Sequence, residues 1–310
     1  MISCVLKPMS RSNKKVIVIT MGDPQGIGPE VIRKALKLEG DSSLKFKGTV
    51  PFSFIVVGDR KILGRVSSSV GVVDVPYKSA GEGSLKFLDK AIALIKGGVA
   101  DALVTAPLSK EAVSRYAKNF VGHTEYLAQA FEVKNFDMMF VAQQVRLTIV
   151  TRHVSLKDVP KMITPKAVLG SIALMSETLK EHFKIRDPKI AVLGLNPHAG
   201  ENGLLGHEET KYILPAIRKA RTLSIKVAGP FPADTFFSFH KPYDGIVAMY
   251  HDQGLAPLKG MYMKELVNFT AGLPFVRTSP AHGTAYDIAG KNKADASSMS
   301  AALKLACQLT

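Results

Sequence analysis

The chain has 310 residues, 46% of them hydrophobic, and a formal net charge of +15. This length exceeds one ordinary core, so either two lobes or one large domain is expected. No long uncharged apolar run is present, which argues against a membrane span. The lysines are spread along the chain rather than gathered in one arm, which argues against a nucleic-acid-binding protein. An alternative use of the positive field is attraction of a small polyanionic substrate.

The two cysteines, Cys4 and Cys307, lie near opposite ends of the chain in no metal-binding or redox spacing. Such sparse cysteine use suits the reducing cytoplasm. The first fifteen residues lack the basic region and the cleavage site of a signal peptide, so we expect a frayed tail there. The expected location is therefore cytoplasmic.

The first half of the chain alternates strands with helices. Residues 16–20 form a β-branched run typical of a parallel strand buried on both faces. A glycine-containing loop at 21–28 follows, and an amphipathic helix then reaches about Leu38. Strand, loop and helix together suit a phosphate cradle, but the glycines match neither the P-loop nor the dinucleotide fingerprint. A simple tight turn is an equally good interpretation of this loop.

Further strands are predicted at 52–58 and 102–105, with helices at 83–96 and from Ser109 onward. This alternation predicts a mostly parallel, doubly wound sheet. A helix over 126–131 is expected to have Thr124 as its N-cap. His123 would then lie near a helix N-terminus, where anions are favoured, although a plain turn residue is the alternative.

The second half continues the same alternation. Two apolar strands around Gln143-Gln144 predict a hairpin, and Asp234 is expected in a rigid turn before a short helix. The remaining predicted elements are strands at 190–193 and 247–250 and helices at 165–179, 208–220 and 297–309.

Three histidines follow apolar strands in this half: His153, His198 and His251. Ligands bind outside the carboxyl ends of strands in open α/β sheets. If the three strands are neighbours, the imidazoles converge and predict a catalytic divalent-metal site. The alternative is three separate histidines that cap loops.

The stretch 249–290 is unusually rich in donors beside apolar segments. Lys259, Asn268 and Arg277 suit phosphate and carboxylate groups, and arginine can hold such an anion through two parallel bonds. A His-Gly-Thr turn at 282–284 closes the stretch. The alternative is ordinary capping and turn chemistry.

Several segments together resemble the 4-hydroxythreonine-4-phosphate dehydrogenase family of pyridoxal phosphate biosynthesis. They are TMGDPQGIGPE, VGHTEYL, LNPHAGENGLLGHEE, GPFPADTFF, MYHDQGLAPLKG and VNFTAGLPFVRTSPAHGTAYDIAGKNKADA. The resemblance runs from about Val16 to the C-terminus, and two segments also resemble isocitrate and isopropylmalate dehydrogenases. It implies a two-lobed α/β fold with mostly parallel sheets flanked by helices. The implied lobes are 1–130 plus 298–310, and 131–297.

The activity that this resemblance implies is oxidation of the secondary hydroxyl of 4-phosphooxy-L-threonine with NAD or NADP. Decarboxylation to 3-amino-2-oxopropyl phosphate would follow. The resemblance further implies one divalent metal per site, either zinc, magnesium or cobalt, and a homodimer whose subunits share the active site. No nucleic-acid or membrane partner is expected.

Site residues carried over from the resemblance fall into four groups. His153, His198 and His251 would be the metal ligands, with His198 and Asp234 near the reacting centre. The implied substrate-binding residues are His123, Thr124, Lys259, Asn268 and Arg277. The implied cofactor-binding residues are His282, Gly283, Thr284 and Asp287.

Three positions depart from the family pattern: Gln25, Ser109 and Arg152. They leave open a dehydrogenase of another phosphorylated four-carbon acid, such as erythronate or threonate 4-phosphate, or of a cyclic diol carboxylate. A metal-dependent sugar-phosphate-binding or hydrolytic protein, which would use bound water and no dinucleotide, is the alternative from another class.

Overall fold

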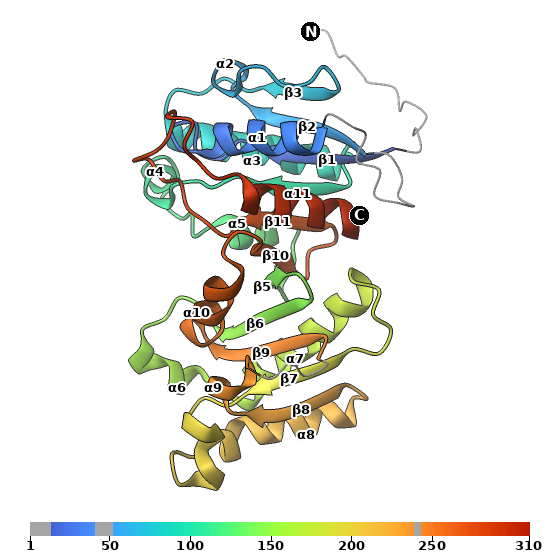
Figure 1. Cartoon of the computed structure of the whole chain (residues 1–310), viewed down its shortest axis with the longest axis vertical. Coiled ribbons are helices and arrows are strands. Elements are labelled where there is room, and N and C mark those ends of the chain that lie inside the picture. The colour runs from blue at the N-terminus through green and yellow to red at the C-terminus, as the bar shows by residue number, and fades with distance from the viewer. Residues whose placement is uncertain (1–13, 41–51, 239–242) are drawn as a thin grey trace.

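The structure is a computed structural model that describes residues 14–40, 52–238 and 243–310. Cys4 and the expected N-terminal tail lie outside these residues. Within them, eleven strands form one sheet in the order β3-β2-β1-β4-β11-β10-β5-β6-β9-β7-β8 (Figure 1). The strands are β1 Lys15–Thr20, β2 Phe52–Gly58, β3 Val70–Asp74, β4 Ala102–Thr105, β5 Asp137–Ala142, β6 Val145–Thr151, β7 Lys189–Leu193, β8 Lys226–Phe231, β9 Gly245–Tyr250, β10 Val267–Ala271 and β11 Val276–Pro280.

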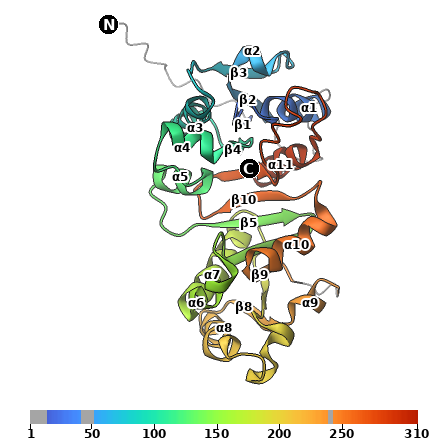
Figure 2. The ribbon, with the colours of Figure 1, turned by 90° about the vertical axis from the view of Figure 1, so that its left-hand side faces the viewer.

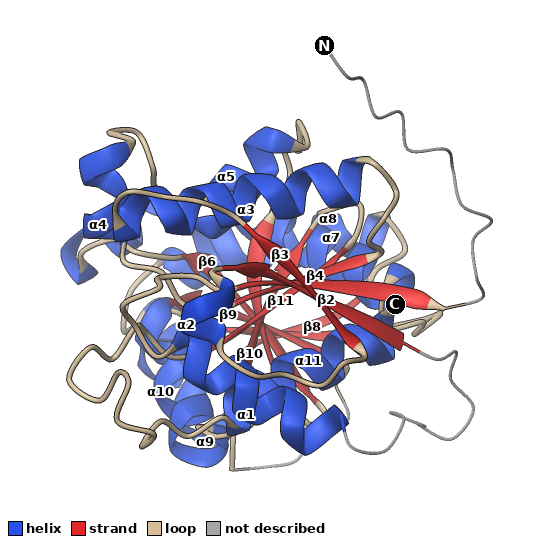
Figure 3. Ribbon diagram, turned by 90° about the horizontal axis from the view of Figure 1, so that it is seen from above, coloured by secondary structure: helices blue, strands red, loops and turns tan. Residues whose placement is uncertain are grey.

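Helices cover both faces of the sheet. The helices α3, α5, α7 and α8 lie on one side of the strands, and α1, α9, α10 and α11 lie on the other, as seen from the side in Figure 2 and from above in Figure 3. The helices are α1 Gly28–Gly40, α2 Arg60–Leu63, α3 Ala80–Lys96, α4 Lys110–Tyr116, α5 His123–Ala130, α6 Val159–Met162, α7 Pro165–Glu181, α8 Leu214–Thr222, α9 Ala233–Phe236, α10 His251–Tyr262 and α11 Ser297–Leu309. No helix in the described part of the chain is long and apolar enough to cross a membrane.

The centre of the sheet is antiparallel, and its outer parts are parallel. β10 runs antiparallel to both β11 and β5, and β5 and β6 form an antiparallel hairpin. The other strand pairs are parallel. The mostly parallel, doubly wound architecture expected from the sequence is therefore confirmed.

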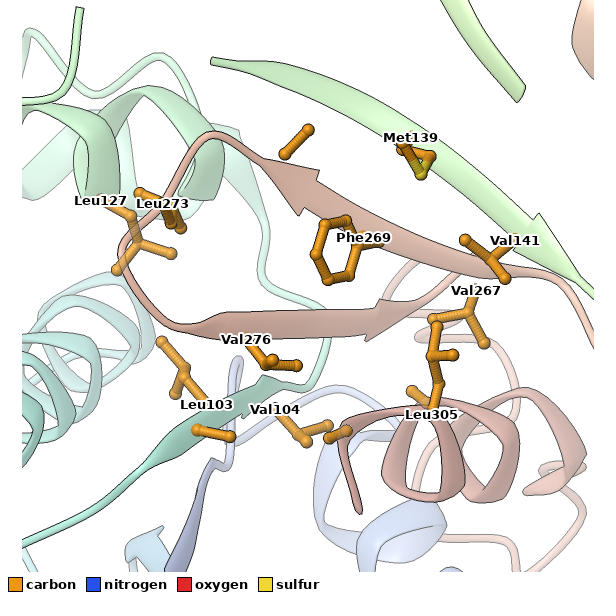
Figure 4. Close-up of a cluster of buried hydrophobic side chains, with 14 of the residues drawn as sticks. Leu103, Val104, Leu127, Met139, Val141, Val267, Phe269, Leu273, Val276 and Leu305 are labelled. Atoms are coloured by element: carbon orange, nitrogen blue, oxygen red, sulfur yellow. The ribbon is translucent and has the colours of Figure 1, made fainter. Parts of the chain in front are cut away.

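A continuous apolar core joins the two halves of the sheet. Phe269 on β10 is fully buried between Met139 and Val141 of β5 on one side and Val276 of β11 on the other (Figure 4). Leu305 of α11 belongs to the same cluster. Burial of a large apolar side chain stabilises by about 1.5–3 kcal/mol, so this seam fixes the halves against each other.

The chain returns to the N-terminal half of the sheet at β11, before its helix α11 begins. β11 pairs with β4, and α11 packs against β11 and α1. Because β10 also pairs with β5, the sheet has no break near residue 130. The division into lobes at 130 and 298 stays a prediction.

Most of the predicted elements are confirmed, including β2, β4 and α11 with the predicted bounds. Two local predictions were wrong. Gly122, not Thr124, occupies the N-cap of α5, so Thr124 lies buried inside the first turn of that helix. Asp234 lies in the first turn of α9 rather than before it. No strand was predicted at the positions of β3, β8, β10 and β11.

Candidate active site

The three strands that precede the candidate metal ligands are neighbours in the sheet. β9 pairs in parallel with β6 on one side and with β7 on the other. Their carboxyl ends therefore meet at one edge, where His153 follows β6, His251 opens α10 and His198 follows β7. The adjacency that the metal prediction required is confirmed.

Two of these histidines are close together. The ring centroids of His153 and His251 are 5.7 Å apart. Burial, with the positive charge of Lys110 and the neighbouring His251, lowers the pKa of His153 below 6.5. His251 Nδ1 lies 2.7 Å from Asp252 Oδ1, a contact that orients its ring. Two imidazoles this close together are suited to binding a divalent metal.

His198 does not join this pair within one chain. It is exposed, and it begins a turn in which five successive residues, 198–202, have positive φ between 41° and 80°. No group of three potential metal ligands occurs among the residues that the structure describes. Within the described residues, one chain alone does not group the three imidazoles, and the three-histidine ligand set, which the family resemblance implies is shared across a homodimer, stays a prediction.

Buried polar contacts hold the His198 turn in place. The carboxylate of Glu209, only 2% exposed, accepts the N–H groups of Leu195 and Asn196, both at 2.7 Å, and the Asn196 side-chain amide at 2.9 Å. A side chain on Gly200 would come within 2.6 Å of that carboxylate. The position of His198 thus depends on a carboxylate that sequence reasoning did not identify.

Gln253 links the end of β9, which His251 follows, to the end of β7, which precedes the His198 turn. Its side-chain oxygen accepts the N–H of Met249 at 2.6 Å, and its side-chain nitrogen donates to the carbonyl of Gly194 at 2.6 Å. It therefore fixes the start of the His251 helix against the start of the His198 turn. It was also missed.

A cationic group lies on the other side of the site. Arg277 is 2% exposed and donates to Thr105 Oγ1 at 2.5 Å and to Thr270 Oγ1 at 2.9 Å. Burial lowers its pKa to about 10, with Glu125 opposing the shift, so it stays charged at neutral pH. Its Nε has no partner in the described part of the protein and remains able to donate to a ligand.

His123 is the first residue of α5, and the positive charge of Arg277 affects its pKa. Burial, followed by the positive charges of Arg277 and Lys110, lowers its pKa well below 6.5. The neutral ring can donate or accept a hydrogen bond at physiological pH. Lys110 also acts on His153, so its charge reaches both the candidate metal ligands and the candidate substrate residues. The signal that sequence reasoning overlooked is its position in the helix directly after β4.

The remaining predicted site residues of this group, Asn268, Lys259 and Asp234, differ in burial and in their contacts. Asn268 on β10 has a buried side-chain oxygen without a hydrogen-bond partner within the described ranges. Lys259 is exposed in the last turn of α10, and Asp234 is exposed on α9. Over residues 14–40, 52–238 and 243–310, no hydrogen bond or ion pair links Lys259 or Asp234 to the histidine pair.

Arg152, one of the departures from the family pattern, contacts two carboxylates beside the histidines. Its guanidinium lies 3.8 Å from Glu125 and 3.8 Å from Asp137. Burial raises the pKa of Asp137 to about 6, while Arg152 opposes that shift. An additional cation and an acid that titrates near neutrality therefore border the histidine pair.

The predicted cofactor loop, residues 282–287, packs against the glycine loop after β1. The carbonyl of Thr284 accepts the N–H of Ile27 at 2.9 Å, and Tyr286 donates to Asp23 at 2.6 Å. His282 Nε2 is buried without a partner in the part of the chain described here, and Asp287 is exposed. Open space surrounds the α-carbon of Gly283. A ring nitrogen, an acidic side chain and an accessible glycine fit the polar groups of a dinucleotide.

The glycine loop itself is a structural turn. Three of its N–H groups are already used: Gln25 donates to the Asp23 side chain, Gly26 donates to the Asp23 carbonyl and Ile27 donates to the Thr284 carbonyl. A side chain on Gly28 would come within 2.2 Å of the Met21 carbonyl. The phosphate-cradle interpretation is not supported, and the tight turn is confirmed.

Polar side chains at the carboxyl ends of neighbouring strands place this protein among the α/β proteins that bind ligands at that edge of the sheet. The fold is shared with a β-decarboxylating dehydrogenase from Thermococcus kodakarensis, at a TM-score of 0.52 and 15% identity over 94% of this chain and 83% of that one. The chain belongs to the PdxA family, because residues 27–306 match the model of the pyridoxal phosphate biosynthetic protein PdxA.

Named relatives support this membership. The chain is 40% identical to the 4-hydroxythreonine-4-phosphate dehydrogenase of Geobacter metallireducens over 96% of each chain. It is 39% identical to a protein of Oceanobacillus iheyensis that bears the provisional name D-threonate 4-phosphate dehydrogenase, over 96% of this chain and 98% of that one. The crystal structure of the Klebsiella pneumoniae 4-hydroxythreonine-4-phosphate dehydrogenase matches with a TM-score of 0.82 and 34% identity, covering 95% and 99% of the two chains.

Proposed function

We propose that this protein oxidises 4-phosphooxy-L-threonine at its secondary hydroxyl with NAD or NADP, and that the product then loses carbon dioxide to give 3-amino-2-oxopropyl phosphate. Family membership supports the reaction class. The observation that carries the site assignment is the 3.8 Å contact between Arg152, the residue before His153, and Glu125, in the first turn of the helix that His123 opens. This contact supports a site in which a candidate phosphate-binding residue and a candidate metal ligand engage one small substrate.

The chemistry divides into two steps. A bound nicotinamide would accept the hydride of the hydroxyl carbon, and a side chain of the protein would accept the hydroxyl proton. The bond to the carboxylate then breaks, its electron pair stays on the carbon beside the new carbonyl, and a proton replaces the carbon dioxide. We assign proton transfer to Asp234, while His198 acts at the reacting centre as a metal ligand. Both are exposed in one chain, so a second subunit has access to them.

Phosphate and carboxylate binding falls to the cationic side of the site. Arg277 offers its Nε–H, which has no partner within residues 14–40, 52–238 and 243–310, and His123 offers a neutral ring. Asn268, whose side-chain oxygen has no partner over the same ranges, would accept a hydrogen bond from a hydroxyl or ammonium group of the substrate. Thr124 and Lys259 complete the proposed set. Binding energy from the phosphate end can be used to place the hydroxyl for reaction, so its loss lowers turnover as well as affinity.

A divalent metal fits the donors present. His153 and His251 would hold it as neutral imidazoles, and His198 would complete the ligand set across a homodimer. When bound, such an ion would lower the pKa of a substrate hydroxyl and stabilise the negative charge left by carbon dioxide. Zinc, magnesium and cobalt are the candidates. The proposed cofactor site consists of His282, Gly283, Thr284 and Asp287.

The deciding experiment measures NADH formation at 340 nm with each metal, over a panel of phosphorylated four-carbon acids. We expect 4-phosphooxy-L-threonine to have the highest kcat/KM, and chelation of the metal to abolish turnover. Higher kcat/KM for threonate or erythronate 4-phosphate would transfer the assignment to that acid. Absence of saturable NAD or NADP binding by calorimetry would favour the metal-dependent hydrolytic alternative.

The four-carbon-acid alternative has an observation in its favour. Arg152, which lies 3.8 Å from both Glu125 and Asp137, adds a positive charge beside the histidine pair. A substrate with an uncharged hydroxyl in place of the amino group would meet less repulsion there. We therefore expect Arg152→Thr to shift the kcat/KM ratio towards the amino acid substrate.

The proposed assembly and location are a cytoplasmic homodimer. Dimerisation follows from the ligand set, since one chain brings two of the three histidines together. Sedimentation at micromolar protein should give twice the chain mass of 33.5 kDa. A fully active monomer would contradict both the dimer and the shared ligand set.

A further inference from the structure

A second cavity, of about 960 Å³, lies at the opposite end of β6 from the histidine edge. Arg146 is the second residue of β6 and lines this cavity, whereas His153 follows the last residue of the same strand. At about 3.3 Å per residue, roughly 20 Å separates the two ends. No residue of the candidate active site lines this cavity.

One wall of the cavity is a polar face of α11. Ser297, Ser300, Lys304 and Gln308 all line it, and their spacing of three and four residues places them on one side of the helix. Ser300 is 6% exposed, and its hydroxyl has no hydrogen-bond partner among the described residues. A buried hydroxyl left unpaired costs about 1–3 kcal/mol, so its presence in a cavity wall points to a ligand.

The facing wall supplies a fixed guanidinium. Arg146 donates to the carbonyl of Gln144 at 3.1 Å and stacks on Phe183 with 4.7 Å to the ring centroid. Its Nε is buried without a partner in the chain as described. Burial lowers the pKa of Arg146, with Asp244 opposing the shift. A desolvated guanidinium with an unused donor favours an anionic partner.

The remaining charges around the cavity are mixed but mainly positive. Lys264 and Lys304 line it together with Arg146, and Glu265 is the acidic residue in the lining. Three cations against one anion give a positive field. Apolar side chains such as Val141 and Leu305 line it as well, and the volume far exceeds that of one phosphate ion.

We propose that this cavity is a second ligand site, for a small organic phosphate whose anionic group binds between Arg146 and Ser300 and whose body contacts the apolar wall. Arg146 Nε and Ser300 Oγ donate to the phosphate oxygens. Lys264 and Lys304 contribute charge. This site is separate from the reaction assigned above, and its occupancy does not depend on that assignment.

Calorimetric titration of the full chain with phenyl phosphate and with inorganic phosphate tests this inference. Hydrogen bonds to charged groups are strong enough that Arg146→Gln should weaken phenyl phosphate binding about tenfold or more. Lys219→Gln, an exposed cation on α8, is the matched control and should leave affinity unchanged. Lys110→Gln reports binding at the candidate active site instead.

Ser300→Ala separates a ligand contact from a structural role. Because the hydroxyl has no partner in the described protein, this variant should melt at the wild-type temperature or above it, yet bind phenyl phosphate severalfold more weakly. If Arg146→Gln does not fold, the titration of Ser300→Ala with phenyl phosphate still tests the proposed site. Phenyl phosphate should bind more tightly than inorganic phosphate.

Several results would overturn the inference. They are the absence of saturable binding by either probe, an unchanged affinity in Ser300→Ala, an equal loss in Lys219→Gln, or a loss confined to Lys110→Gln. The last result would place the anion in the candidate active site.

Discussion

Replacing Glu209 with glutamine should weaken metal binding without unfolding the protein. Its buried carboxylate accepts three hydrogen bonds, from the backbone of Leu195 and from the backbone and side chain of Asn196. A hydrogen bond to a charged group contributes about 1.5–3 kcal/mol, against about 0.5–1.5 kcal/mol for a neutral one. The glutamine amide also presents a donor where a carboxylate oxygen accepted. The expected cost is about 1–3 kcal/mol.

That cost is comparable to the strain in the turn that Glu209 supports. Four non-glycine residues of the turn, His198, Ala199, Glu201 and Asn202, have positive φ. Such conformations cost on the order of 1 kcal/mol or more each and persist only when their surroundings enforce them. Weakening the anchor lets the turn relax, and His198 then leaves the position from which it would bind metal.

The assay is turnover as a function of added metal, together with thermal unfolding. We expect the half-activating metal concentration to rise about tenfold or more, since 1.4 kcal/mol corresponds to a factor of ten. Glu208→Gln is the matched control, because Glu208 accepts from the Asn196 side chain, whereas the backbone N–H groups of Leu195 and Asn196 donate to Glu209. Unchanged metal dependence in Glu209→Gln, with a lowered melting temperature, would refute the link between this carboxylate and the ligand.

Three further predictions concern single residues. His198→Ala should abolish turnover with an unchanged circular dichroism spectrum, and full activity with unchanged bound metal by elemental analysis would contradict the ligand assignment. Lys259→Ala should lower kcat/KM about tenfold on the phosphorylated substrate, and an equal loss on the dephosphorylated compound would show that Lys259 does not bind phosphate. His123, whose pKa lies well below 6.5 when folded, stays neutral where the unfolded chain takes up a proton. Stability should therefore fall as pH drops below 6.5, and less steeply in His123→Gln; parallel melting curves would argue against this linkage.

The strand-end histidines were predictable because local signals place them. β6, β7 and β9 are short apolar runs that stop at polar residues, and parallel neighbours carry such ends to one edge. The left-handed turn after β7 gives no comparable signal. Its positive φ values fall on non-glycine residues and depend on Glu209, which lies beyond the turn in the sequence.

Of the central antiparallel strands, the β5–β6 hairpin was predicted, but β10 and β11 were not predictable from local pattern. Arg277 could be recognised as an anion-binding side chain, but its hydroxyl partners lie on different strands, with Thr105 distant by 172 residues. Thr124 as an N-cap failed because α5 begins one residue before it and Gly122 fills that position without a side-chain bond. Lys110 acquires its role only when α4 and α5 come together.

The pairing of β11 with β4 has a consequence for synthesis on the ribosome. β4 is made early, but its partner strand β11 and the helix α11 that packs on α1 are made only after residue 275. Until they do, β4 presents an unpaired strand edge, and α1 lacks part of its apolar cover. Premature termination near residue 265 should therefore damage the N-terminal half of the fold first, although every residue of that half has been translated.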